Sequence, residues 1–214
     1  MIKKILFGSK DKMKSAYLWN TCAAMLNAFQ TVFILMLISR IDPVIDAGVF
    51  TIAFAIGNLM MAIGKYGIRQ FQVSDVEEKY SFKEYTVARI ITSIIMIAAS
   101  FVYVGVNLAS GLNDSSKSIV IILICLAKVI DAVEDVIHGM FQQYLRLDVA
   151  GKILSIRMCT YIFVYLVCYY FSKNLILTSA VALLVSFIQF VILNYTAIRG
   201  FEIKKKTFEI KNVK

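Results

Sequence analysis

The chain has 214 residues, of which 59% are hydrophobic and 17% are charged, and its formal net charge is +9. Soluble domains usually carry about 25% charged residues, so this composition argues against an ordinary water-soluble domain. Short alternating apolar segments, which would indicate a transmembrane β-barrel, are missing. Because a helix of roughly 20 apolar residues crosses a bilayer, we expect an all-α, multi-pass membrane protein.

Six apolar runs are long enough to cross a bilayer, and polar or helix-breaking residues separate them. The first run is too long for the apolar core of a signal peptide, so we expect an uncleaved helix that ends at Arg40–Pro43. The expected helices are Ser15–Ile38, Ala47–Tyr66, Tyr85–Leu108, Ser118–Phe141, Ile153–Phe171 and Leu175–Ile198. They form one lobe, residues 15–198, between a basic N-terminus, residues 1–14, and a basic tail or linker, residues 199–214.

The basic residues between these helices predict the orientation. Apart from Lys128, nineteen Lys and Arg residues lie on the side of the two termini, and three, Arg40, Lys117 and Lys173, lie on the other side. Short loops rich in Lys and Arg stay in the cytoplasm, so both termini are expected there. The basic residues are thus explained by the orientation of the helices in the membrane. We therefore expect the bilayer rather than nucleic acid as the partner.

The fourth expected helix carries a stripe of polar and ionisable residues. At 100° per residue the stripe covers an arc of about 120°, and the opposite face is apolar and suited to lipid. Its members are Lys128, Asp131, Glu134, Asp135, His138, Gln142 and Arg146. A charge near the centre of a bilayer costs roughly 2.5–3.5 kcal/mol. The stripe must therefore face protein or water.

Three interpretations of this stripe are open. Lys128 attracts Asp131 three residues away, while Asp131 repels Asp135 four residues away, and two such close carboxylates form a candidate proton-binding site. The stripe can instead lock the helix to its neighbours, or the helix can lie shallower, with residues 134–138 at the headgroups. Arg157, near the start of the fifth helix, can pair with the carboxylates or extend to the interface.

Other sequence features are less informative about function. Asn20, Asn27, Gln30 and Thr31 share one face of the first helix, where amides can bond sugar hydroxyls or neighbouring helices. The chain contains no GxxxxGK[ST], HExxH or GxSxG motif and a single histidine. We therefore expect neither an enzyme nor a bound cofactor or metal.

Three segments resemble a known family. Asp46–Ala55 (DAGVFTIAFA) resembles the opening of the second helix in bacterial polysaccharide and lipopolysaccharide (O-antigen) flippases, of the multidrug/oligosaccharidyl-lipid/polysaccharide exporter superfamily. Gly67–Asp75 (GIRQFQVSD) resembles the loop that follows this helix, and Gly139–Gly151 (GMFQQYLRLDVAG) resembles the end of the fourth helix. The three segments occur in the family's order and span most of the chain.

The resemblance implies a transporter of the bacterial inner membrane that flips a lipid-linked oligosaccharide, of the polyprenyl-pyrophosphate type, to the outer leaflet. Two lobes would rock about a central cavity. The stripe, Asn20 and Asn27 would line this cavity, and Lys128 or Arg157 would bind the pyrophosphate. Because such flippases have two lobes of this size, the chain resembles the N-terminal half, which needs a second lobe or a homodimer. The alternatives are an ion-coupled exporter of small molecules and a non-transporting scaffold of glycan assembly.

Overall fold

The computed structural model describes the backbone of residues 2–42 and 44–212, and no strand occurs among them. The helices are α1 (Ile2–Phe7), α2 (Lys12–Ile41), α3 (Ile45–Lys65), α4 (Ile68–Ser74), α5 (Phe82–Ala109), α6 (Ser115–Gln143), α7 (Leu147–Ser172) and α8 (Leu175–Asn212). Five segments in this part of the chain are long and apolar enough to cross a membrane: α2, α3 together with α4, α5, α7 and α8. The multi-pass, all-α expectation is therefore confirmed, and a sixth crossing by α6 stays a prediction.

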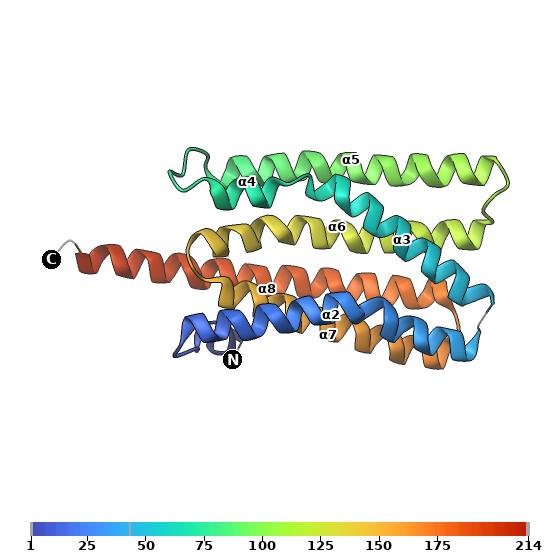
Figure 1. Cartoon of the computed structure of the whole chain (residues 1–214), viewed down its shortest axis with the longest axis horizontal. Coiled ribbons are helices and arrows are strands. Elements are labelled where there is room, and N and C mark those ends of the chain that lie inside the picture. The colour runs from blue at the N-terminus through green and yellow to red at the C-terminus, as the bar shows by residue number, and fades with distance from the viewer. Residues whose placement is uncertain (1, 43, 213–214) are drawn as a thin grey trace.

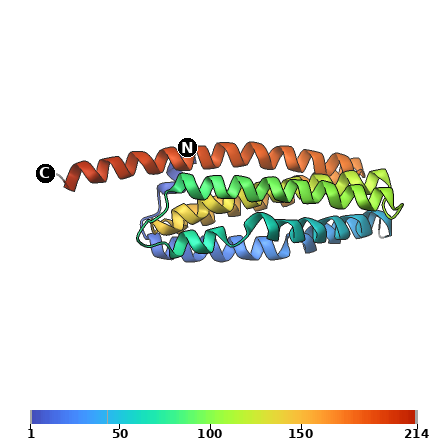
Figure 2. The ribbon, with the colours of Figure 1, turned by 90° about the horizontal axis from the view of Figure 1, so that it is seen from above.

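The long helices lie side by side in one elongated bundle, with both termini at the same end (Figure 1). On one side α3 packs against α6 and α5, and on the other α2 packs against α7, while α8 contacts both α6 and α7. Seen from above, α5 and α8 lie on one side of the bundle and α2 and α3 on the other, with α6 between them (Figure 2). This arrangement makes α6 the central helix.

Several expected helix boundaries are wrong. The first long helix begins at Lys12 rather than Ser15, the fifth begins at Leu147 rather than Ile153, and the sixth runs past Ile198 to Asn212. Lys and Arg are good helix formers, so basic residues at the ends of the apolar runs extend the helices instead of stopping them. Pro43, which was expected to help end the first helix, lies outside the described residues; α2 ends at Ile41.

The polar stretch from 67 to 84 was expected to be a loop, but it contains α4. Tyr66 and Gly67 both have positive φ, 38° and 67°, a conformation that glycine adopts without strain. The helix therefore breaks at these two residues and resumes as α4, which packs against α6. A capping box of Ser81 and Glu84 then begins α5.

Asp75 organises the connection between α4 and α5. Its carboxylate accepts hydrogen bonds from the backbone N–H of Tyr80 (3.0 Å), the hydroxyl of Tyr85 (2.7 Å) and the backbone N–H of Lys79 (2.9 Å). These bonds favour the ionised form and lower the pKa of Asp75 below its ordinary value. The carboxylate is consequently charged at neutral pH and holds the connection together.

The N-terminal segment is docked on the bundle through α1. Leu6 is fully buried and Phe7 is 9% exposed. The buried Lys152 of α7 donates hydrogen bonds from Nζ to the carbonyl oxygens of Ile5 (3.0 Å) and Leu6 (3.1 Å) and to Oγ of Ser9 (2.6 Å). A cation at the C-terminal end of a helix satisfies its free carbonyl groups, so Lys152 acts as the C-terminal cap of α1.

We expect Lys152→Met to release α1 from the bundle. The substitution removes three hydrogen bonds from a buried cation, and their loss costs about 1–3 kcal/mol. Amide hydrogen exchange of residues 2–10, measured by mass spectrometry, should accelerate about tenfold or more. Lys117→Met, at the far end of the bundle, is the control and should leave this exchange unchanged. Equal exchange rates in the two variants would show that α1 docks without Lys152.

The apolar core consists of two clusters. Along α6, the first cluster includes Val120 to Ala132 and the second includes Val136 to Phe141. Ala132 and Val136 are at most 1% exposed, and Val129 and Val133 are partly buried, so the face of this helix that was expected to meet lipid is largely covered. The expectation of a lipid-facing side is wrong because other helices surround α6. The ionised residues of α6 lie where the two apolar clusters meet.

Candidate functional site: a buried network of ionised side chains

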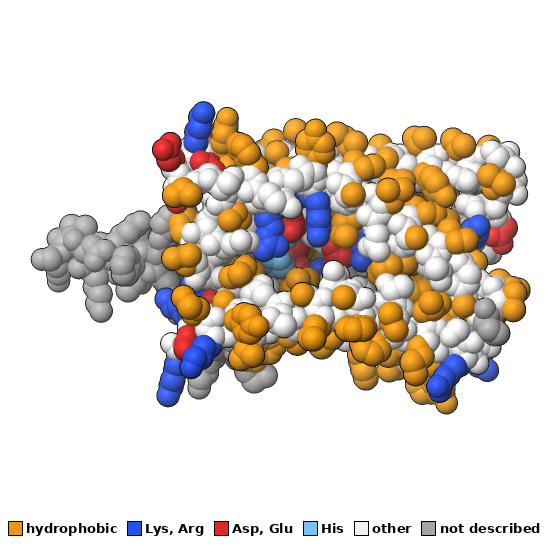
Figure 3. Space-filling model, in the orientation of Figure 1, with side chains coloured by type: hydrophobic (Ala, Val, Ile, Leu, Met, Phe, Trp, Pro, Cys, Tyr) orange, Lys and Arg blue, Asp and Glu red, His pale blue; other side chains and the backbone are white. Residues whose placement is uncertain are grey.

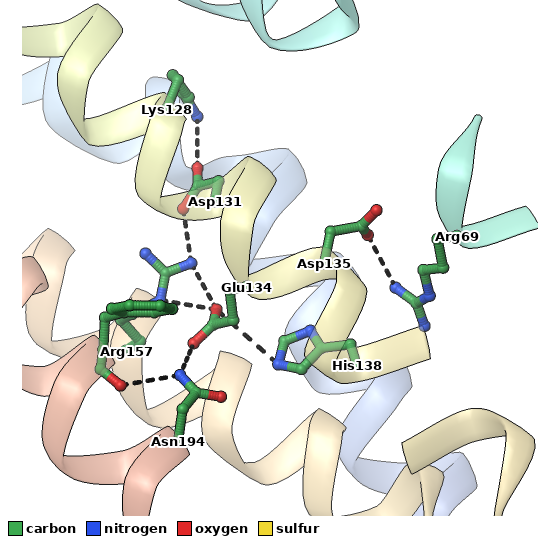
Figure 4. Close-up of polar contacts among 9 residues, drawn as sticks. Arg69, Lys128, Asp131, Glu134, Asp135, His138, Arg157 and Asn194 are labelled. Carbon is green, nitrogen blue, oxygen red and sulfur yellow. Dashed lines mark hydrogen bonds and ion pairs between the residues drawn. The ribbon is translucent and has the colours of Figure 1, made fainter. Parts of the chain in front are cut away.

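The ionisable stripe of α6 lies inside the bundle. Lys128, Glu134 and His138 are at most 3% exposed, and Asp135 is 9% exposed. Asp131 is slightly more open, with 14% of its side chain exposed. Charges buried to this degree require partners, and the neighbouring helices supply them on two sides (Figure 4).

On the first side Arg157 of α7 joins two carboxylates. One of its terminal nitrogens lies 2.6 Å from Oδ1 of Asp131, and its Nε donates to Oε2 of Glu134 at 2.9 Å. Nζ of Lys128 lies 3.4 Å from Oδ2 of Asp131 and 4.3 Å from the ring centre of Phe54. The structure therefore contains both expected pairings, Lys128 with Asp131 and Arg157 with the carboxylates.

Glu134 has two further neighbours. Asn194 of α8 donates from Nδ2 to Oε1 of Glu134 at 2.8 Å. Nε2 of His138 lies 3.9 Å from Oε2 of the same carboxylate (Figure 4). Glu134 thus connects α6 to both α7 and α8.

On the second side Asp135 binds two guanidinium groups. Arg69 of α4 lies 3.2 Å from Oδ1 and Arg89 of α5 lies 2.8 Å from Oδ2. Arg89 is fully buried and also donates to the carbonyl oxygen of Gly64, the penultimate residue of α3, at 2.7 Å. A single carboxylate therefore joins α4 and α5 to α6, and Arg89 adds the end of α3.

Asp131 and Asp135 turn toward different cations and do not face each other (Figure 4). The geometry therefore does not contain the close carboxylate pair that suggested a proton-binding site. Arg146 also leaves the expected stripe, because α6 ends at Gln143. Its Nε instead donates to Asp148 at 2.9 Å. Gln142 remains with the network and accepts a hydrogen bond from Arg69 at 2.8 Å.

The polar residues of α2 separate into different environments. Asn20 donates from Nδ2 to the carbonyl oxygen of Leu147 at 3.0 Å, which is a bond between helices. Asn27 is exposed and makes no hydrogen bond to any described residue. Gln30 is 3% exposed and lines a small cavity with Lys128 and Arg157. Gln30, rather than Asn27, is therefore the residue of this face that reaches the network.

Three members of the network were not expected from the sequence: Arg69, Arg89 and Asn194. All three lie outside the stripe of the fourth expected helix, and Arg69 and Arg89 belong to the nineteen basic residues counted on the side of the termini. A signal for Arg89 is its place inside the third expected helix, Tyr85–Leu108. No local pattern indicates that Arg69 contacts Asp135, because the contact depends on the helix break at Gly67.

The network contains four basic side chains, Arg69, Arg89, Lys128 and Arg157, and three carboxylates, Asp131, Glu134 and Asp135. Acidic and basic side chains come into view in a hollow in the middle of one face of the bundle, with hydrophobic side chains on either side (Figure 3). The side chain of Arg69 is 28% exposed. This surplus of positive charge at a hollow suits an anionic ligand.

Among the described residues, no group of three or more His, Cys, Asp or Glu side chains is arranged to hold a metal ion. In comparisons with known proteins, no family model, no curated protein and no solved structure matches this chain. The site must therefore be interpreted from its own geometry.

Proposed function

We propose that this chain is one lobe of a membrane transporter that flips a lipid-linked oligosaccharide from the inner to the outer leaflet by alternating access. The proposal rests chiefly on one observation, the network of seven ionised side chains inside a bundle of membrane-type helices. Ionisable groups at such positions are costly and usually mark a transport pathway. The three segments that resemble polysaccharide flippases give the proposal its substrate class.

The charge and shape of the hollow agree with this function. A polyprenyl-pyrophosphate carrier has an anionic head, and the network has one more cation than carboxylates. A face with charged side chains in a hollow is unsuited to lipid contact, so a second lobe or a second copy of the chain would cover it. The substrate site would then lie between two halves, as alternating access requires.

The network also offers a way to change conformation. Asp135 holds α4, α5 and α6 together, whereas Asp131 and Glu134 hold α6, α7 and α8 together. An anionic head group that competes for Arg69 or Arg157 would weaken one of these connections. Binding of substrate would thereby be linked to movement of one group of helices against the other.

We expect Asp131→Asn and Asp135→Asn to abolish surface glycan, a loss larger than any decrease in the amount of membrane-inserted protein. The assay uses the source organism lacking its own copy of the chain, complemented with wild type or variant, so that any partner lobe is present. Glu77→Gln, which removes an exposed carboxylate outside the network, is the control and should restore glycan fully. Surface glycan is measured with a lectin, and protein level by immunoblotting of membranes.

Two outcomes would contradict the proposal. Normal glycan in the deletion strain would show that the chain does not export glycan. Normal glycan with both variants would show that the network only holds the helices together, as in a scaffold. Expression of the chain alone in a host without a flippase then tests its partner requirement: glycan would indicate a homodimer, and no glycan a separate second lobe.

A further inference from the structure

A long apolar groove runs between α2 and α7 near the end of the bundle opposite the termini. It has a volume of about 450 Å³, which makes it far larger than the cavity inside the network. Its walls are almost entirely apolar: α2 contributes Phe33, Met36 and Leu37, and α7 contributes Leu166, Val167 and Tyr170. Both helices are of membrane-spanning length and composition, so the groove opens toward the lipid phase.

The groove changes in polarity along its length. Phe33 lies nearer the middle of α2, whereas Arg40 lies in the last turn, about 10 Å further along the helix axis. Arg40 is exposed and forms no hydrogen bond or ion pair with the described residues. On α7, Tyr170 lies near the same end, and tyrosine is common where a membrane helix meets the headgroups. The groove is therefore apolar at its inner end and cationic at its outer end.

We propose that this groove binds one acyl chain of an anionic phospholipid, whose phosphate group pairs with Arg40. The chain would lie against Phe33, Met36 and Val167, which are 47%, 56% and 40% exposed and thus available to it. A phosphate at the helix end would supply the partner that Arg40 lacks within the protein, since Arg binds phosphate through two parallel hydrogen bonds. The proposal requires only that α2 and α7 are membrane helices, and does not depend on the transport function.

The change from an apolar inner end to a cationic outer end of the groove favours a lipid over a protein partner. A second copy of the chain or another helix would have to bring a carboxylate to Arg40 and an apolar ridge to the groove. A phospholipid carries both features in one molecule, in the required order along the membrane normal. A basic residue near anionic lipid gains about 1 kcal/mol, which corresponds to about fivefold in affinity.

The test is a titration of the full-length chain in detergent with phosphatidylglycerol or phosphatidylcholine of identical acyl chains, followed by native mass spectrometry. Wild type should bind the first phosphatidylglycerol about fivefold more tightly than the first phosphatidylcholine. Arg40→Gln should remove this preference, and Lys117→Gln, which removes another cation expected on the same side, should retain it. Val167→Trp, which fills the groove, should weaken binding of both lipids, unlike Val102→Trp on the exposed face of α5.

Three results would overturn the proposal. Equal affinity of wild type for the two lipids would show that the groove does not select anionic lipid. Equal behaviour of Arg40→Gln and Lys117→Gln would show that Arg40 is not the phosphate partner. Val167→Trp that converts dimers to monomers without changing lipid binding would identify the groove as a protein interface. Circular dichroism and elution volume confirm that each variant is folded before titration.

Discussion

Replacing Arg157 with Met should destabilise the protein more than any other single substitution in the network. The change leaves Asp131 and Glu134 buried beside α7 without their common cation, which lies 2.6 Å and 2.8 Å from them. Removing one partner of a buried ion pair typically costs 3–5 kcal/mol, because the remaining charge is not solvated. In a protein of this size such a loss lowers the melting temperature by roughly 10 °C. Thermal unfolding in detergent, followed by loss of the monodisperse elution peak, measures the change.

Arg199→Met is the matched control, because Arg199 is an exposed arginine on α8 whose guanidinium carbon lies 5.1 Å from the ring centre of Tyr195. Its substitution should shift the melting temperature by no more than a few degrees. Adding Glu134→Gln to Arg157→Met should recover part of the loss, since Glu134 is then neutral while Asp131 keeps its ion pair with Lys128. Equal melting temperatures for Arg157→Met and Arg199→Met, or no recovery in the double variant, would contradict a stabilising role for this ion-paired cluster.

The sequence was sufficient to predict the class of fold, because apolar runs of membrane-spanning length depend only on local composition. It was less informative about where helices end. Capping and packing make two further segments helical, Lys12 to Lys14 and Leu147 to Lys152. An example is the hydrogen bond from the backbone N–H of Lys14 to the side chain of Asp11. The end of the second helix at Tyr66 was predicted, but α4 after it was missed, since a polar stretch after an apolar run is typical of a loop.

The stripe on α6 was predictable because it is periodic within one helix. Its partners were harder to predict, since the contacts from Arg69, Arg89 and Asn194 depend on how α4, α5 and α8 pack around α6. The same limit explains the misjudged apolar face: a helix that is apolar on one side and charged on the other can face lipid or lie at the centre of a bundle. Which of these applies depends on the number of neighbouring helices, a tertiary property.

We expect Gly151→Ala to separate α2 from α7. A Cβ atom on Gly151 would lie 2.9 Å from the backbone N of Asn20 and 2.9 Å from the backbone C of Trp19. Both are backbone atoms of α2, which cannot yield as a flexible side chain can. Small residues at such positions allow membrane helices to approach closely, and overpacking costs about 1–3 kcal/mol. The bonds from Asn20 to the carbonyl of Leu147 and from Ser155 to the carbonyl of Trp19 should lengthen as α2 moves away.

Gly105→Ala provides the opposite expectation from the same chemical change. Gly105 lies within α5, and a Cβ atom there would have no neighbour within 4 Å. Alanine lowers the entropy cost of helix formation by about 0.5–1 kcal/mol relative to glycine, so this variant should melt at the same or a slightly higher temperature. The direction in which each substitution changes the melting temperature therefore tests whether α2 and α7 are in close contact at Gly151. If Gly151→Ala also melts at or above the wild-type temperature, α2 and α7 are not held in backbone contact at Gly151. If it melts lower while Gly105→Ala does not, α2 and α7 are held in close backbone contact at Gly151.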